Sequence, residues 1–151
     1  TFLANATLKA LAISELTDAL VLSDDSGLEV DALGGDPGVF SSRYGGEDGN
    51  DALNNAKLLR ELGEEANRRA RFRCVIVLAR GGESLADFSG AVEGLILKAA
   101  QEGEGGFGYD PLFVPDGHQE SFARLGEEVK NTMSHRSRAL DGVRGWLGEN
   151  G

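Results

Sequence analysis

The sequence is poor in features that mark several classes of protein. Its one cysteine, Cys74, excludes an internal disulfide and favours a reducing, intracellular compartment. No apolar run is long enough to cross a bilayer, and no charged-then-apolar leader opens the chain. We therefore expect a cytoplasmic protein without a membrane span. Because Cys74 lies in an alternating strand pattern, it is expected to be a small core residue rather than a nucleophile.

Basic residues are also scarce, with 15 Lys and Arg against 25 Asp and Glu, for a formal net charge of −10. This balance argues against long nucleic acids as partners, because binding them requires many phosphates to be neutralised. A small phosphorylated ligand needs only a local cationic pocket. Four cationic side chains near the C-terminus indicate such a pocket: Lys130, His135, Arg136 and Arg138. The alternative is a solvated basic helix face.

Several common catalytic signatures are absent. There is no Gly-x-x-x-x-Gly-Lys-Ser/Thr loop, so the chain is not a P-loop enzyme. A dinucleotide fingerprint, a zinc-spaced set of Cys and His, and a serine elbow are missing as well. The chemistry therefore has to come from other segments.

The apolar pattern predicts alternating helices and strands. Helices are expected over 1–15, 50–62 and 127–147, the last with a break near Ser134. Strands are expected over 19–22, 28–33, 71–78, 85–97 and 111–114, with a hairpin turn at Gly81-Gly82. A flexible loop is expected over 102–106. The length and this order predict one domain, residues 1–151, of α/β class with a central mixed β-sheet flanked by helices.

The first segment whose side chains suit metal binding or catalysis is Asp24-Asp25-Ser26-Gly27, at the expected end of a strand. Mg²⁺ prefers a few carboxylate oxygens and takes its other ligands from water and substrate phosphates. Such an ion lowers the pKa of bound water and shields phosphate charge. The alternative is an Asx-type turn whose carboxylates cap backbone amides.

The second segment runs from Gly105 to Pro111 and places glycines on both sides of Phe107. Open access to the ring faces suits stacking on a planar base, and Asp110 would then hydrogen-bond to the base edge. The alternative is a strand-entry loop whose aromatic residues cover the core.

The third segment runs from Lys130 to Arg136. At a helix start, His135 and Arg136 would meet a ligand with cationic side chains and free backbone amides. Lys130 offers phosphate a point charge, whereas Arg136 can bond in bidentate fashion. A lone histidine is more often structural, so His135 is a candidate binding residue only because Lys130 and Arg136 are close to it in the sequence. Together the three segments fit a nucleotide polyphosphate with Mg²⁺.

This combination resembles the inosine triphosphate pyrophosphatase family, the non-standard purine nucleoside triphosphate pyrophosphatases or dITP/XTP diphosphatases. The matching stretches run in the family's order across almost the whole chain. The most specific are Asp24-Asp25-Ser26-Gly27-Leu28, Gly106-Phe107-Gly108-Tyr109-Asp110-Pro111 and Ser134-His135-Arg136. Others include Asn5-Ala6 and Leu8-Lys9-Ala10.

The resemblance implies Mg²⁺-dependent hydrolysis of ITP, dITP and XTP to the monophosphate and pyrophosphate. It implies that Asp25 binds the metal, with Asp24 beside it, and is the catalytic base that deprotonates water. The substrate-binding residues would be Ser26, Phe107, Gly108, Tyr109, Asp110, Lys130, His135 and Arg136. The implied fold has a long sheet, two lobes with an active-site cleft between them, and a homodimeric assembly.

The sequence also departs from the family it resembles. There, an opening strand and helix with a phosphate loop and a metal-binding glutamate come before the position of Thr1, so the chain looks like one that starts within the domain. Ala4 stands where the family usually has glutamate, and Val129 where it usually has an acid. The alternatives are a catalytically impaired, purine-nucleotide-binding fragment of this family, a hydrolase of modified pyrimidine or methylated nucleotides, and a structural protein.

Overall fold

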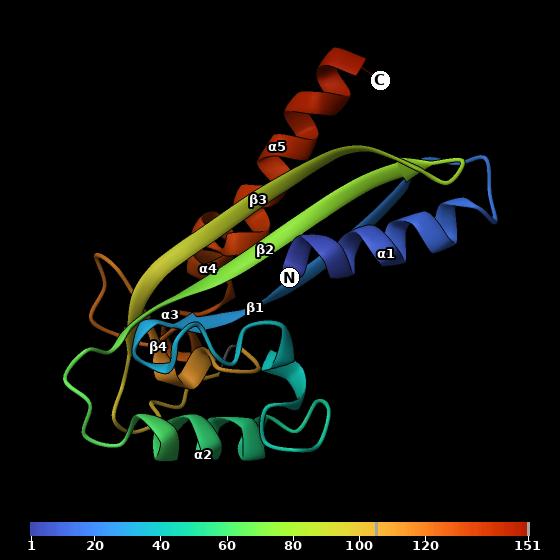
Figure 1. Cartoon of the computed structure of the whole chain (residues 1–151). Coiled ribbons are helices and arrows are strands. Elements are labelled where there is room, and N and C mark those ends of the chain that lie inside the picture. The colour runs from blue at the N-terminus through green and yellow to red at the C-terminus, as the bar shows by residue number, and fades with distance from the viewer. Residues whose placement is uncertain (105, 151) are drawn as a thin grey trace. The chain divides into compact units, whose positions relative to one another are not determined.

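The computed structural model describes residues 1–104 and 106–150 (Figure 1). Gly105, placed in the 102–106 loop by the sequence analysis, and Gly151 lie outside the described residues. The helices are α1 (Phe2–Ser14), α2 (Asp51–Leu62), α3 (Phe122–Leu125), α4 (Glu127–Met133) and α5 (His135–Asn150). The strands are β1 (Val21–Val30), β2 (Arg69–Arg80), β3 (Glu83–Ile96) and β4 (Phe113–Pro115). Short 3-10 helices are η1 (Asp31–Leu33), η2 (Gly38–Arg43) and η3 (Asp110–Leu112).

The strands form one sheet in the order β1-β2-β3-β4. Gly81 and Gly82, with φ of 60° and 82°, form the turn between β2 and β3, which confirms the expected hairpin. β4 pairs antiparallel with β3, with Gly94 opposite Pro115. The expected α/β class with helices beside a central sheet is confirmed. Its described strands pair antiparallel, whereas the sequence pattern predicts a mixed sheet; the turn between β2 and β3 is too short for a parallel crossover.

The acidic segment lies within a strand rather than at its end. The sequence pattern predicts separate strands over 19–22 and 28–33, but β1 runs unbroken from Val21 to Val30 and η1 follows it. The polar residues remain extended because their side chains bond to other elements instead of capping their own turn. The expected helix break at Ser134 is confirmed, since its backbone is extended (φ −63°, ψ 154°).

The chain divides into two compact units, in line with the two lobes that the family resemblance implies. Unit 1 contains Thr1–Ser26, Arg73–Ala91 and His135–Gly151. Unit 2 contains Gly27–Phe72 and Val92–Ser134. Strands β1, β2 and β3 supply residues to both units. The single domain expected over 1–151 stays a prediction. Within the described residues, no helix has the length and apolar character to cross a membrane.

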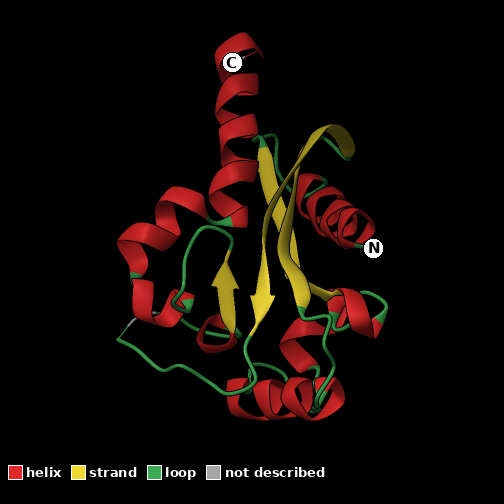
Figure 2. Cartoon of the chain, turned by 90° about the vertical axis from the view of Figure 1, so that its left-hand side faces the viewer, coloured by secondary structure: helices red, strands yellow, loops and turns green. Residues whose placement is uncertain are grey.

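In unit 1, helices α1 and α5 lie on opposite sides of the β2–β3 ribbon (Figures 1 and 2). The α5 side is packed by alternating residues of β2 against small residues of the helix: Cys74, Ile76, Leu78, Ala139 and Val143. Cys74 is fully buried, which confirms its expected place in the core. α5 also crosses β3 closely, since a Cβ on Gly90 would meet the carbonyl oxygen of His135 at 2.3 Å.

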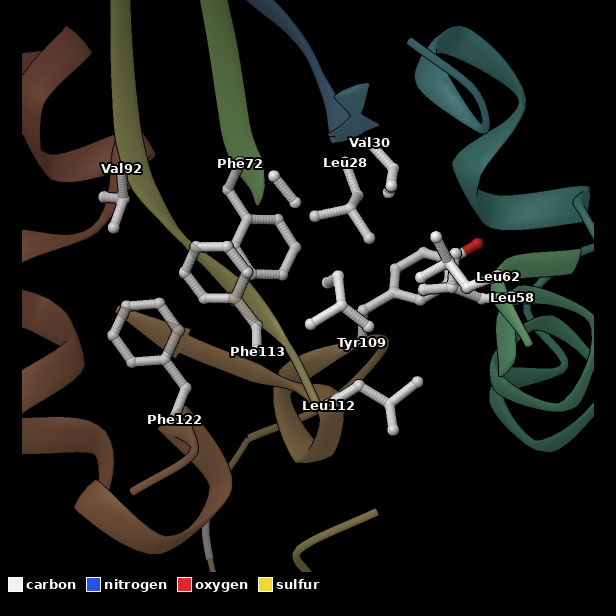
Figure 3. Packing of buried hydrophobic residues seen from close by; sticks show 12 residues of the cluster. Leu28, Val30, Leu58, Leu62, Phe72, Val92, Tyr109, Leu112, Phe113 and Phe122 are labelled. Carbon is white, nitrogen blue, oxygen red and sulfur yellow. The ribbon is translucent and has the colours of Figure 1, made fainter. Parts of the chain in front are cut away.

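Unit 2 has an aromatic core (Figure 3). The ring of Phe113 from β4 lies 4.6 Å from that of Phe72 and 5.5 Å from that of Phe122, centre to centre. Leu58 and Leu62 of α2 pack in the same cluster. These contacts hold β4, α2 and α3 together. They therefore also anchor the loop over 106–110, which leads into η3.

Candidate active site

The acidic segment of β1 and the start of α5 meet in unit 1. Side chains alternate between the two faces of a strand, so Asp24 and Ser26 share a face that Asp25 does not. Nη2 of Arg136 donates to Oδ2 of Asp24 and to Oγ of Ser26, each at 3.2 Å. The structure thus joins three residues that the sequence analysis selected, although 110 positions separate Arg136 from Ser26.

The carboxylate of Asp25 faces α1. Nδ2 of Asn5 donates to Oδ2 of Asp25 at 3.3 Å, and Nζ of Lys9 lies 3.9 Å from Oδ1. Lys9 also donates to the backbone carbonyl of Asp24. Neither Asn5 nor Lys9 is among the site residues predicted from the sequence. The available signal was their spacing of four residues, which places both side chains on one helix face, within stretches that match the family.

The carboxylates suit a magnesium ion that brings other ligands with it. Among the described residues, no group of three or more His, Cys, Asp or Glu is arranged for a metal. Mg²⁺ needs only one or two protein carboxylates, because water and substrate phosphates complete its coordination. The side chain of Asp25 is 22% exposed and fits this role. Asp24 bonds to Arg136 through Oδ2, and its expected place as a second metal residue stays a prediction.

The second group of selected residues lies in unit 2. Nζ of Lys130 donates to Oδ2 of Asp110 at 2.6 Å, and the two side chains are only 11% and 3% exposed. The same ammonium lies 4.2 Å from the centre of the Phe107 ring. Phe107 is itself 66% exposed, so much of its ring faces solvent. An aromatic surface, a cation and a carboxylate are therefore held together at one place.

Tyr109 is placed differently from its neighbours. Its ring belongs to the unit 2 core (Figure 3), and its hydroxyl donates to the backbone carbonyl of Ser41 at 2.6 Å. Burial raises the pKa of Tyr109 well above its ordinary value of 10.0. Tyr109 thus anchors the loop from inside, while Gly108 is half-buried. His135 is the first residue of α5 and directly precedes Arg136.

Comparison with known proteins identifies the family. The family model described as the Ham1 family matches residues 1–146. A dITP/XTP pyrophosphatase of Desulforamulus reducens is 52% identical over 142 residues, covering 93% of this chain and 70% of the relative. One of Halalkalibacterium halodurans is 48% identical over 149 residues, covering 97% and 76%.

A solved structure indicates the same family as the family model. The Staphylococcus aureus Ham1 protein superposes with a TM-score of 0.94 at 41% identity, covering 100% of this chain and 78% of that one. The resemblance inferred from the sequence is thereby confirmed. The family model matches residues 1–146, and the two sequence relatives are 52% and 48% identical to the chain. The chain therefore belongs to the Ham1 family.

Proposed function

We propose that this chain hydrolyses non-standard purine nucleoside triphosphates, dITP, XTP and ITP, to the monophosphate and pyrophosphate. Its relatives at 52% and 48% identity carry the name dITP/XTP pyrophosphatase. The observation that carries the proposal is the Lys130–Asp110 pair beside the exposed Phe107 ring, because it offers stacking and hydrogen bonding to a base in one place.

In this proposal the unit 2 group recognises the base. Phe107 stacks on the purine, and Lys130 donates to an oxygen at its 6-position. An amino group at that position presents a donor to the ammonium, so adenine leaves buried polar groups unpaired. Sites that hydrogen-bond to a substrate reject wrong edges strongly for this reason.

The chemistry at the polyphosphate is assigned to the unit 1 group. Asp25 orients an attacking water and accepts its proton, while Asn5 and Lys9 hold the carboxylate in place. Arg136, His135 and Ser26 bind phosphate oxygens with charged and neutral donors. Mg²⁺, when bound at Asp25, supplies positive charge that shields the phosphates and favours ionisation of water.

The proposal is tested by measuring pyrophosphate release from dITP, XTP, ITP, ATP and GTP, with Mg²⁺ and with EDTA. Release from dITP, XTP and ITP that requires the metal is the expected result, with little from ATP, which lacks the 6-oxo group, and little from GTP, which carries a 2-amino group that the expected substrates lack. If no nucleotide is cleaved but dITP still binds, the chain is a purine-nucleotide-binding fragment of the family. Cleavage of modified pyrimidine nucleotides instead would contradict the assigned base specificity.

A homodimer that works in the cytoplasm is part of the same proposal, on the strength of the family resemblance. Light scattering coupled to size-exclusion chromatography gives the mass directly. A mass close to that of one 16.0 kDa chain at micromolar concentration would contradict the dimer.

A further inference from the structure

The loop before η3 has its backbone amides tied to carboxylates. The N–H of Gly106 donates to Oε1 of Glu127 at 3.0 Å, and that of Phe107 to Oδ2 of Asp110 at 2.9 Å. The N–H of Gly108 donates to Oδ2 of Asp51 at 2.9 Å. Three consecutive amides are therefore held by α4, η3 and α2, all within unit 2.

Gly108 is held at both of its backbone polar groups. Besides the bond from its N–H to Asp51, its carbonyl accepts from Nδ2 of Asn55 at 3.0 Å. Asp51 and Asn55 stand four residues apart in α2, and such a pair projects from one helix face. Gly108 has a φ of 61°, a conformation that glycine adopts without strain. α2 thus presents an acceptor and a donor that match one residue of the loop.

The helix does not need these two side chains for its own cap. Oδ1 of Asn50 already accepts from the N–H of Leu53 and caps α2. Oδ1 of Asn55 is buried and has no hydrogen-bond partner among the described residues, which is unfavourable. The bond of Asn55 to Gly108 offsets this cost.

The neighbour of Gly108 is Phe107, whose ring has little core packing to direct it because it is 66% exposed. Apart from the Lys130 ammonium, which lies 4.2 Å from the ring centre, its direction depends on the backbone of its neighbours. We infer that Asp51 and Asn55 are positioning residues that hold the 106–110 loop so that Phe107 and Lys130 meet the purine base. The inference rests on the proposed function, since it assigns these residues to base recognition.

Paired substitutions at Asp51 separate the hydrogen bond from the charge. Asp51→Ala removes the acceptor and is expected to raise KM for dITP about tenfold, the loss of one bond to a charged group, with kcat within about twofold. Asp51→Asn keeps an acceptor oxygen and is expected to restore most of the affinity. Asn55→Asp puts a carboxylate against the Gly108 carbonyl and should raise KM at least as much as Asn55→Ala. Asp48→Ala is the control, because it removes an exposed carboxylate elsewhere in unit 2.

Exchange of the Gly108 amide hydrogen, followed by NMR, reports on the loop without any turnover. Its protection should fall in Asp51→Ala and persist in both Asp51→Asn and Asp48→Ala. Unchanged protection and unchanged KM in Asp51→Ala would overturn the inference, as would an equal loss of affinity in Asp48→Ala.

The Phe107→Ala variant distinguishes this inference from the function beneath it. If Phe107→Ala raises KM while Asp51→Ala does not, the positioning role is wrong and base recognition by Phe107 stands. If Phe107→Ala leaves KM unchanged, the assignment of Phe107 to base recognition is wrong, and the positioning role is wrong with it.

Discussion

The ammonium of Lys130 lies 2.6 Å from Oδ2 of Asp110, with both side chains largely withdrawn from solvent. A buried ion pair is costly to break from one side, because the remaining charge loses its partner without regaining water. Lys130→Met should therefore lower the free energy of unfolding by about 3–5 kcal/mol, measured in urea. Adding Asp110→Asn should recover part of this loss, since the amide oxygen still accepts from the Phe107 N–H.

The exposed pair of Lys98 with Glu64 is the matched control, with side chains 63% and 91% exposed. Lys98→Ala should cost at most about 1 kcal/mol, as exposed pairs generally do. A loss in Lys130→Met no larger than this would contradict the large cost expected for breaking a buried ion pair from one side.

The exposed ring of Phe107 should matter for binding and little for stability. Phe107→Ala is expected to weaken binding of dITP by about 1–3 kcal/mol, the usual contribution of one aromatic ring stacked on a base. The unfolding free energy should stay close to that of the wild type, because Phe107 is 66% exposed. Titration calorimetry measures the first quantity. Phe107→Trp keeps an aromatic surface and should bind as the wild type does or better.

The carboxylate of Asp25 should be needed for turnover more than for binding. Asp25→Asn keeps the size of the side chain and removes its negative charge and its basicity. Pyrophosphate release should therefore be abolished while dITP binding remains measurable in the presence of Mg²⁺. Asp18→Asn, an exposed acid of the same unit, should retain full turnover. Wild-type rates in Asp25→Asn would remove this residue from the mechanism.

The thiol of Cys74 should be unreactive while the protein is folded. Burial raises its pKa from 9.0 to about 11, so about one thiol in a thousand is ionised at pH 8. Mass spectrometry after iodoacetamide at pH 8 should show no modification of the native protein and full modification in urea.

The same shift predicts a dependence of stability on pH. Because the folded pKa lies above the ordinary one, the contribution of Cys74 is complete below about pH 9 and is lost as the pH rises through about 11. Cys74→Ala should show a smaller loss over that window. Rapid native alkylation, or an unchanged pH dependence in Cys74→Ala, would contradict burial as the cause.

Local chemistry alone accounts for much of what the sequence predicted correctly. The leucines of α2 recur at helical spacing, and Gly63 ends the helix within one residue of the expected position. Gly81-Gly82 forms the expected hairpin turn, because the conformation of that turn is one that glycine adopts without strain. The break at Ser134 and the short motifs that identify the family likewise depend only on residues that are close together in the sequence.

By itself, the sequence determined the α/β class, the main helices and strands, the family, and the segments that carry the chemistry. Only the tertiary structure decided which side chains meet. Asp25 bonds to Asn5 across 20 positions and Arg136 to Asp24 across 112, so no local pattern reveals either pair. Those distant partners also explain why β1 continues through Asp24 and Asp25, where polar residues alone had indicated a turn. A hydrogen bond depends on distance in space, and the packing of the folded chain sets that distance.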